Sequence, residues 1–344
     1  MLSYILKRVL LMIPTLLGAL TVTFVVMQFV PGGPVEQIMA EASAGAGGET
    51  SGYKAGRDLD KKQREELMKL YGFDKPAHVR YVEMLGNFLR FDLGKSFLQY
   101  KDVWQLIKEK LPVSISLGIW TFLISYLVSV PLGVAKAVRE GTRFDALTTL
   151  GVLLGYAIPG FVLGVLLIVL FAGGSFLDWF PLRALTSDNW ETLSAFGKVK
   201  DYFWHLTLPL TCLVIHQFAV VTLLTKNTFV EEIRKQYVLV ARAKGLSQQR
   251  VLYKHIFRNA LIPLVTGFPA AFIGAFFAGS VLIETLFSLD GLGLLSYESV
   301  VRRDYPVVLG SLYFFTLIGL VVKLVSDLLY RVVDPRVQFG SVAK

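Results

Sequence analysis

The amino-acid sequence predicts an all-α membrane protein with six membrane-spanning helices. Hydrophobic residues make up 54% of the chain and charged residues 18%, whereas soluble domains carry about a quarter charged residues. Mean hydropathy is +0.56. The apolar residues gather into blocks separated by short charged segments, and each block is long enough to cross about 30 Å of hydrocarbon as a helix.

The expected spans follow from these apolar blocks, taken in chain order. They lie near Val9–Val30, Val113–Ala135, Ala146–Ala172, His205–Thr225, Leu261–Phe287 and Pro306–Tyr330. Lys7 and Arg8 precede the first block, as in a secretory signal, but the block is longer than a signal core and no small-residue cleavage site precedes Pro31. We therefore expect it to remain as a span.

Basic residues in the short loops predict the orientation of the spans. Lys136, Arg139 and Arg143 follow the second span, and the loop after the fourth span carries eight more basic residues. Short loops rich in Lys and Arg stay in the cytoplasm. We expect both termini on that side and residues 31–112 on the outer side.

Composition also divides the chain into expected regions. Residues 1–30 form an N-terminal tail and the first span, and residues 31–112 form the outer loop. That loop contains a Gly/Ala-rich insert at residues 40–56. Two helical patterns follow it and predict a small helical cap. The first pattern is Leu67, Leu70 and Tyr71, and the second is Tyr81, Leu85, Phe88 and Leu89. Residues 113–335 form a five-helix core that includes a cytoplasmic loop at residues 226–260, and residues 336–344 form a tail.

Patterns typical of enzymes and metal sites are missing from the sequence. Gly94-Lys95-Ser96 resembles the end of a phosphate-binding loop, but Leu89 stands where its first glycine belongs. The four histidines are far apart and Cys212 is the single cysteine, so no triad, zinc spacing or internal disulfide emerges. We expect a chain without catalytic activity, metal or cofactor.

The cytoplasmic loop carries the most informative pattern. Ile233, Tyr237, Ala241 and Gly245 recur every four residues and form one face of a helix. Gly245 is typical of a helix end, and Ser247 of the N-cap of a following helix. Two interpretations fit equally: an amphipathic helix on anionic lipid headgroups, or a docking element for a soluble partner.

Residues 237–247 have the sequence Tyr237-Val238-Leu239-Val240-Ala241-Arg242-Ala243-Lys244-Gly245-Leu246-Ser247. This segment resembles the coupling loop of ABC importer permeases for dipeptides and oligopeptides. The continuation over residues 251–263 is similar too, although Arg258 stands where the general pattern has a proline and Pro263 comes later. Further landmarks occur in order at residues 31–34, 71–76, 91–96, 291–293, 303–306 and 334–336. The insert and Gly33 are most similar to the branch that imports peptides and the peptide-nucleotide microcin C.

The resemblance implies the type I ABC importer permease fold in the bacterial inner (cytoplasmic) membrane. It implies a second homologous permease, two ATP-binding cassette subunits and a periplasmic peptide-binding protein as partners, without nucleic acid. ATP hydrolysis would lie on the cassettes, and this chain would move peptides into the cytoplasm by alternating access. The coupling residues it implies are Tyr237, Ala241, Arg242, Ala243, Lys244, Gly245, Leu246 and Ser247, with Ala241 and Gly245 expected at closest approach to the ATPase.

Polar residues inside the expected spans are candidate pathway or helix-interface residues. His216 and Gln217 lie within the fourth span, where a hydrogen bond between helices is favoured. Glu284 lies near the outer end of the fifth span, where it meets either a peptide amino group or headgroup water.

Several alternatives stay open from sequence alone. A related importer for dipeptides, glutathione or nickel carries the same motifs. A secondary transporter usually shows internal repeats and midplane charge pairs, and we find no repeat between the halves. A membrane-embedded enzyme needs a clustered catalytic set, which the sequence lacks.

Overall fold

The structure, a computed structural model, describes residues 2–37, 39, 64–69, 72–172, 174, 176–277 and 280–333. These residues form helices and connecting loops without a strand, which confirms the all-α class. The Gly/Ala-rich insert, Leu70, Tyr71 and the tail at residues 336–344 lie outside the described residues. Within the expected cap, residues 64–69 and helix α4 (Ala77–Phe88) are helical.

The chain folds as two compact units. Unit 1 comprises residues 1–111 and 295–320, and unit 2 comprises residues 112–294 and 321–344. Two long helices, α5 (Val103–Val138) and α15 (Tyr305–Val333), contribute residues to both units. Sequence patterns predicted a boundary near residue 112 but did not predict that residues 295–320 join the N-terminal part.

Unit 1 contains α1 (Leu2–Phe29), α4, most of α14 (Leu292–Val301) and the beginnings of α5 and α15. The loop before α5 is fastened to the loop before α15: Ser96 Oγ donates to the buried Asp304, and the Phe97 amide donates to Asp304 Oδ1 at 3.0 Å. A side chain at Gly310 would lie 2.8 Å from Val103 Cγ1. These contacts explain why segments some 200 residues apart share a unit.

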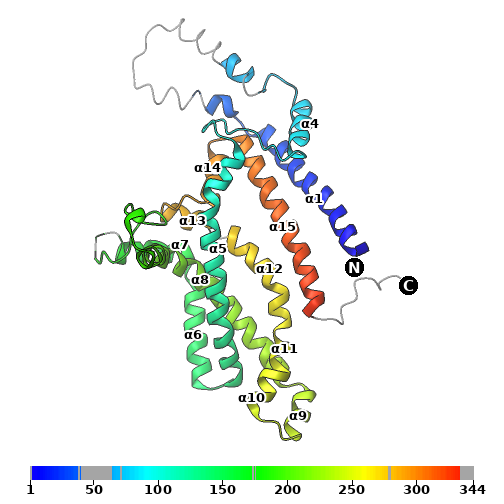
Figure 1. The fold of residues 1–344 in the computed structure, drawn as a ribbon, viewed down its shortest axis with the longest axis vertical. Coiled ribbons are helices and arrows are strands. Elements are labelled where there is room, and N and C mark those ends of the chain that lie inside the picture. Colours follow the sequence, from blue (N-terminus) through cyan, green and yellow to red (C-terminus); the bar gives the residue numbers. More distant parts are fainter. Residues whose placement is uncertain are drawn as a thin grey trace. The chain divides into compact units, whose positions relative to one another are not determined.

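Unit 2 is built around α8 (Ala195–Ile233). The helices α6 (Arg143–Ala157), α7 (Gly160–Phe171), α12 (Ile262–Phe277) and α13 (Ser280–Leu286) complete it, with a short 3-10 turn η1 at Trp190–Thr192. Leu117 of α5, Leu206 and Leu210 of α8 and Phe287 form the centre of one apolar core. In Figure 1, α6 runs alongside the part of α5 that belongs to this unit.

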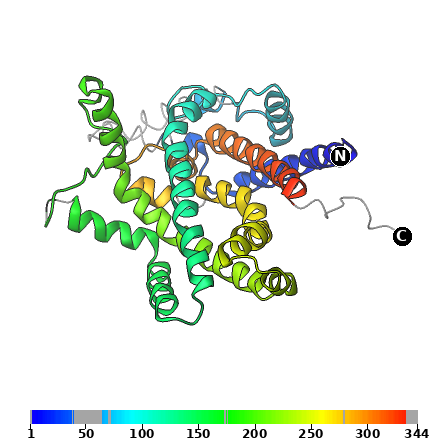
Figure 2. The same cartoon turned by 60° about the horizontal axis from the view of Figure 1, so that its bottom comes forward.

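Short helices form one end of unit 2. They are α9 (Gln236–Ala243), α10 (Gln248–Arg250), the π-helical η2 (Val251–Ile256) and α11 (Phe257–Ala260). Figure 1 places this segment, coloured yellow-green, at the foot of the view, and Figure 2 brings it forward. The helix–turn–helix expected from the sequence is therefore present.

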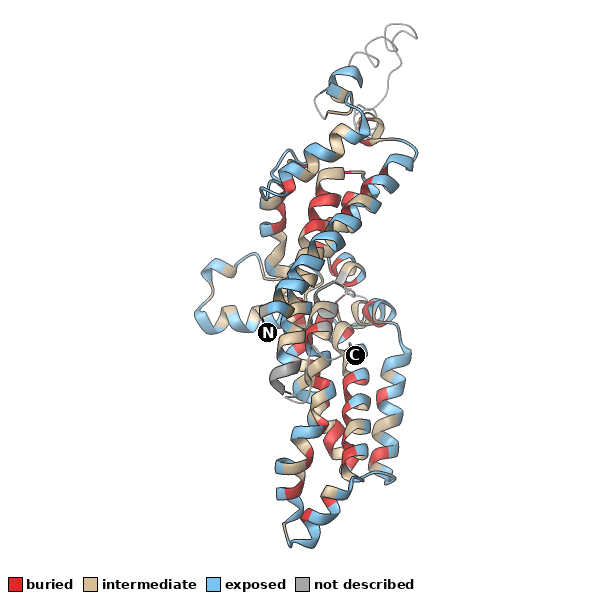
Figure 3. Cartoon of the chain, turned by 90° about the vertical axis from the view of Figure 1, so that its right-hand side faces the viewer, coloured by how far each residue is buried: buried red, intermediate tan, exposed pale blue. Residues whose placement is uncertain are grey.

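Among the described residues, four helices are long and apolar enough to cross a membrane: Ser3–Phe29, Val103–Val138, Ala195–Ile233 and Tyr305–Leu329. Most of the apolar stretch of α1 is exposed, as Figure 3 shows, because only 11% of it is buried in the protein. Such a surface suits a helix solvated by lipid.

The third expected span differs from the prediction, because it is two helices bent by 90°. Pro159 caps α7, and Ile158 before it is extended, with φ −84° and ψ 117°. A proline pushes the preceding residue out of the helical region, and this ends α6. Counting the bent pair as one span gives five.

The fifth expected span is described only in part, because residues 278–279 lie outside the described residues. Its residues lie in α12 and α13, which have 16 and 7 residues and are too short to count as spans by themselves. The described residues thus contain four or five spans by length, and the number six stays a prediction.

Candidate functional site

The turn after α9 has the local geometry that the sequence predicts. Gly245 adopts φ +79°, the left-handed region that favours glycine. Its amide donates to Arg242 O at 2.9 Å, and the amide of Leu246 donates to Ala241 O. Ser247 Oγ then accepts from the Arg250 amide as an N-cap. Nothing lies within 4 Å of a Cβ placed on Gly245, so its backbone conformation alone requires glycine.

The burial of α9 shows which side faces the protein. Val238 and Ala241 are 0% and 7% exposed and pack in a core that joins α5, α8, α9, η2 and α11. Leu239, Val240 and Tyr253 are 61%, 54% and 64% exposed. Ala241 therefore lies against the protein's own helices, contrary to the expectation that it approaches a partner most closely.

Tyr237 ties α9 to its neighbours. Its hydroxyl donates to Glu232 Oε2 at 2.6 Å and lies 3.4 Å from the carbonyl oxygen of His255, so α8, α9 and η2 meet at one side chain. Lys235 also donates to Glu232. Burial and the neighbouring Glu232 raise the pKa of Tyr237 to about 12.

A buried ionic cluster lies among the ends of α5, α6 and α8, and we name it the Asp145 cluster. Lys136 Nζ is 3.1 Å from Asp145 Oδ1, and Lys226 Nζ is 2.7 Å from Asp145 Oδ2. The Lys136 side chain is 0% exposed and also donates to the hydroxyls of Thr148 and Thr149 at 2.8 and 2.7 Å. Every donor of this ammonium is used, which is the condition for burying a charge.

A second, exposed ion pair lies nearby. Arg234 Nη2 donates to both carboxylate oxygens of Glu140 at 3.0 Å, and the side chains are 69% and 42% exposed. It connects the end of α8 to the turn after α5. Since exposed pairs contribute about 0.2–1 kcal/mol, it adds little beside the Asp145 cluster.

The remaining predicted residues of the loop lie at the surface or near it. Arg242, Ala243, Lys244, Gly245 and Ser247 are exposed, and Leu246 is half-buried against the core beneath α9. Together with Leu239 and Val240 they leave an accessible strip on α9 and the turn that follows it.

The candidate pathway residues fall into different environments. His216 is exposed and stacks on Tyr156 of α6, with ring centroids 4.6 Å apart, while Gln217 is half-buried. Glu284 is 0% exposed, and its Oε2 accepts from the Leu294 amide at 2.7 Å. A Cβ at Gly291 would lie 2.5 Å from its carboxyl carbon. In this structure Glu284 holds the turn between α13 and α14, and its role in a pathway stays a prediction.

Sequence reasoning missed the Asp145 cluster. It used Lys136 and Lys226 only as topological charges and gave Asp145 no role. The available signal was that an ionisable group near a span costs free energy and therefore normally has a partner. Within the described ranges no group of His, Cys, Asp or Glu residues could hold a metal ion.

Residues 129–339 match the family described as binding-protein-dependent transport system inner membrane component. The chain belongs to this family. It is a multi-pass protein of the bacterial inner membrane and a permease subunit of an ABC transport system. This membership disfavours the secondary transporter and the membrane enzyme.

Relatives match over nearly the whole chain. The peptidoglycan transport system permease protein YejB of Agrobacterium fabrum is 53% identical over 98% of this chain and 98% of its own. The inner membrane ABC transporter permease protein YejB of Escherichia coli is 51% identical, covering 98% and 99%. The oligopeptide transport system permease protein AppB of Bacillus subtilis is 33% identical, covering 98% and 100%.

A solved structure shows the same fold. A chain of the MetNI methionine ABC transporter, in inward-facing conformations, superposes with a TM-score of 0.50 at 16% identity. The match covers 67% of this chain and 96% of that one. It supports the type I permease fold and says nothing of the cargo.

Proposed function

We propose that this chain is a permease subunit of an ATP-driven peptide importer, in which α9 and its turn dock on a separate ATPase subunit. The relatives named for oligopeptide and dipeptide transport, which match 98% of the chain, support peptides as the cargo class. Peptide-nucleotides similar to microcin C are the narrower cargo that the insert and Gly33 suggest. A panel of peptides transported by the reconstituted complex tests the cargo.

The proposed assembly contains a second homologous permease, two ATP-binding cassettes in the cytoplasm and a periplasmic binding protein. ATP hydrolysis takes place on the cassettes, and their closure moves α9. Because the Tyr237 contacts and the core beneath α9 connect it to α5 and α8, a push on α9 is transmitted to two long helices. Bound ATP then biases the permease between inward-open and outward-open states.

The exposure of Leu239, Val240 and Tyr253 carries the docking proposal. These large apolar side chains lie on a short basic segment whose inner face is already filled. Burying an exposed leucine at an interface contributes about 1.5–3 kcal/mol. The surface therefore fits a protein partner with an apolar groove.

The test is Leu239→Asp, with copurification of the ATPase in detergent as the measurement. We expect ATPase retention to fall at least about tenfold, since a buried carboxylate replaces apolar contact. Val82→Asp on α4 is the matched control because Val82 is 65% exposed and lies in unit 1. Retention of the ATPase by Leu239→Asp at the level of Val82→Asp rules out docking through this face.

The lipid-surface interpretation of the same segment predicts a different pattern. There, neutralising Lys244, Arg250 and Lys254 together weakens binding to anionic vesicles, while ATPase retention in detergent stays unchanged.

A further inference from the structure

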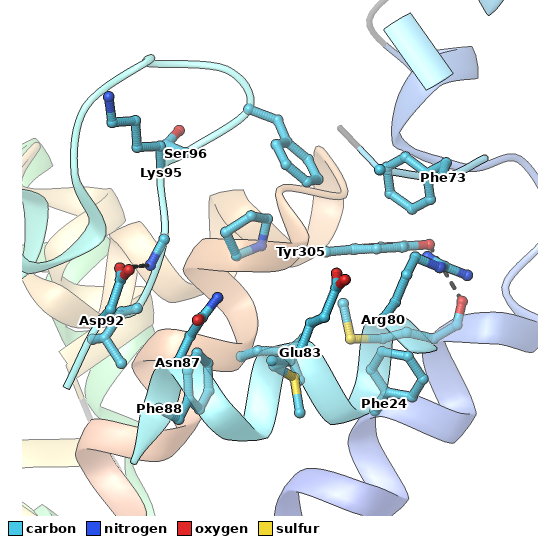
Figure 4. Close-up of a pocket in the computed structure, with 18 of the residues that line it drawn as sticks. Phe24, Phe73, Arg80, Glu83, Asn87, Phe88, Asp92, Lys95, Ser96 and Tyr305 are labelled. Atoms are coloured by element: carbon cyan, nitrogen blue, oxygen red, sulfur yellow. Dashed lines mark hydrogen bonds between the residues drawn. The ribbon is translucent and has the colours of Figure 1, made fainter. Parts of the chain in front are cut away.

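Unit 1 contains a cavity of about 780 Å³ that the transport proposal does not use. It lies between α1, α4, the loop at residues 92–97 and the start of α15, and Figure 4 shows it in close-up. Its walls include six aromatic side chains, Phe24, Phe73, Phe88, Phe97, Tyr100 and Tyr305, beside polar and charged ones. Small-molecule sites in proteins have volumes of about 300–1,000 Å³, with mostly apolar walls and a few placed polar groups.

Arg80 supplies the main polar group of this cavity. Its guanidinium carbon lies 4.8 Å from the centre of the Phe73 ring, and Nη2 donates to Gln28 Oε1 at 2.7 Å. Nε is buried, and no acceptor among the described residues contacts it. Burial also lowers the pKa of Arg80. The Arg80 side chain is thus half-buried, and no described carboxylate forms an ion pair with it.

The two acidic residues of the cavity have partners other than Arg80. Glu83, one turn from Arg80 on α4, pairs with Lys75 at 2.6 Å. Asp92 Oδ1 accepts the Gly94 amide at 3.0 Å. In Figure 4, Arg80 and Glu83 both rise from α4 toward the side where Phe73 and Tyr305 lie.

The balance of charge around the cavity is positive. Four basic residues, Lys69, Lys75, Arg80 and Lys95, line it against the two acids Glu83 and Asp92. Lys69 and Lys95 form no ion pair with another described residue. The cavity therefore attracts an anion, and Arg80 is the basic residue among them whose Nε is buried without an acceptor.

We propose that this cavity is a binding site for a small ligand that carries a carboxylate beside an aromatic or aliphatic body. The carboxylate pairs with Arg80, whose flat guanidinium matches its two oxygens. The apolar body packs against the aromatic walls, where a buried ring gains most from leaving water. This site is separate from the α9 end and requires neither ATP nor transport.

The probe is N-acetylphenylalanine, compared with its amide, which has the same body without the charge. Binding is measured by equilibrium dialysis against the full-length chain in nanodiscs with its partner subunits and without a binding protein. We expect the acid to bind at least about tenfold more tightly than the amide, as a charge-assisted contact requires. Equal affinity for acid and amide, or no binding of either, overturns the proposal in the wild-type protein.

Variants then assign the contact. Arg80→Gln should weaken binding of the acid about ten- to hundredfold and leave the amide unchanged. Arg90→Gln removes the same charge from an exposed residue that does not line the cavity, and it should bind the acid as the wild type does. Thermal unfolding checks that both variants fold, and Arg80→Lys should recover part of the affinity. Undiminished acid binding by folded Arg80→Gln also overturns the proposal.

Discussion

Asp145 forms ion pairs with two lysines, the buried Lys136 and the half-buried Lys226. Removing its charge leaves the fully buried Lys136 ammonium with hydroxyl and carbonyl oxygens alone. Removing one partner of a buried ion pair lowers stability by about 3–5 kcal/mol, because the remaining charge is uncompensated. Asp145 should therefore contribute more to stability than a carboxylate in an exposed ion pair does.

We predict that Asp145→Asn lowers the free energy of unfolding by about 3–5 kcal/mol. Glu140→Gln, which removes a carboxylate from the exposed pair with Arg234, should cost less than about 1 kcal/mol. Thermal unfolding of the detergent-purified variants makes the comparison. Similar melting temperatures for the two variants would show that the Asp145 cluster is not a stabilising contact.

Gly245 allows a separate prediction at the same scale. A side chain there meets empty space but must adopt φ +79°, which costs about 1–2 kcal/mol for most residues. Gly245→Val should therefore destabilise the turn by that amount, and Gly245→Asn by less, because asparagine tolerates this region. Hydrogen exchange of the α9 amides measures the difference. Equal exchange in Val and Asn variants would contradict a conformational cause.

At the scale of elements, α9 acts through its attachment to α8 and η2. The Tyr237 hydroxyl makes this attachment, and a phenylalanine would leave the buried Glu232 with one donor fewer. An unsatisfied buried acceptor costs about 1–3 kcal/mol. Loosening α9 in this way should separate ATP hydrolysis from movement of the long helices.

We predict that Tyr237→Phe keeps the ATPase bound but lowers the peptide transported per ATP hydrolysed by the reconstituted complex. Tyr253→Phe removes the same atom from an exposed ring and serves as the control. If Tyr237→Phe and Tyr253→Phe transport with the same efficiency, the Tyr237 contact does not serve coupling.

For the whole molecule, orientation in the membrane is the property that the basic loops predict. The chain contains one cysteine, Cys212, which is 2% exposed, so the wild type should resist thiol reagents. We predict that Gln99→Cys and Gln248→Cys, both at exposed positions, react with an impermeant maleimide from opposite sides of the membrane. Labelling of both from one side in spheroplasts would reject the orientation.

The sequence alone determined the features that depend on neighbours along the chain. Apolar blocks predicted the helices, and the order Gly245, Leu246, Ser247 predicted the end of α9 and the start of α10. Glycine tolerates a positive φ and serine caps a helix through its own backbone geometry, so no distant contact is needed. Pro159 carried a similar local signal for the break between α6 and α7, and the span prediction did not use it.

Tertiary structure decided which side of each element is covered, because that depends on segments far apart in the chain. Helical spacing placed Ala241 and Gly245 on one face of α9, but only the core beneath α9 shows that Ala241 points inward and Leu239 outward. In the same way Asp145 meets Lys226 from 81 positions away, and Glu284 is enclosed by Gly291 and Ser114. A charge in an apolar span needs a partner, and only the packing of the helices selects it.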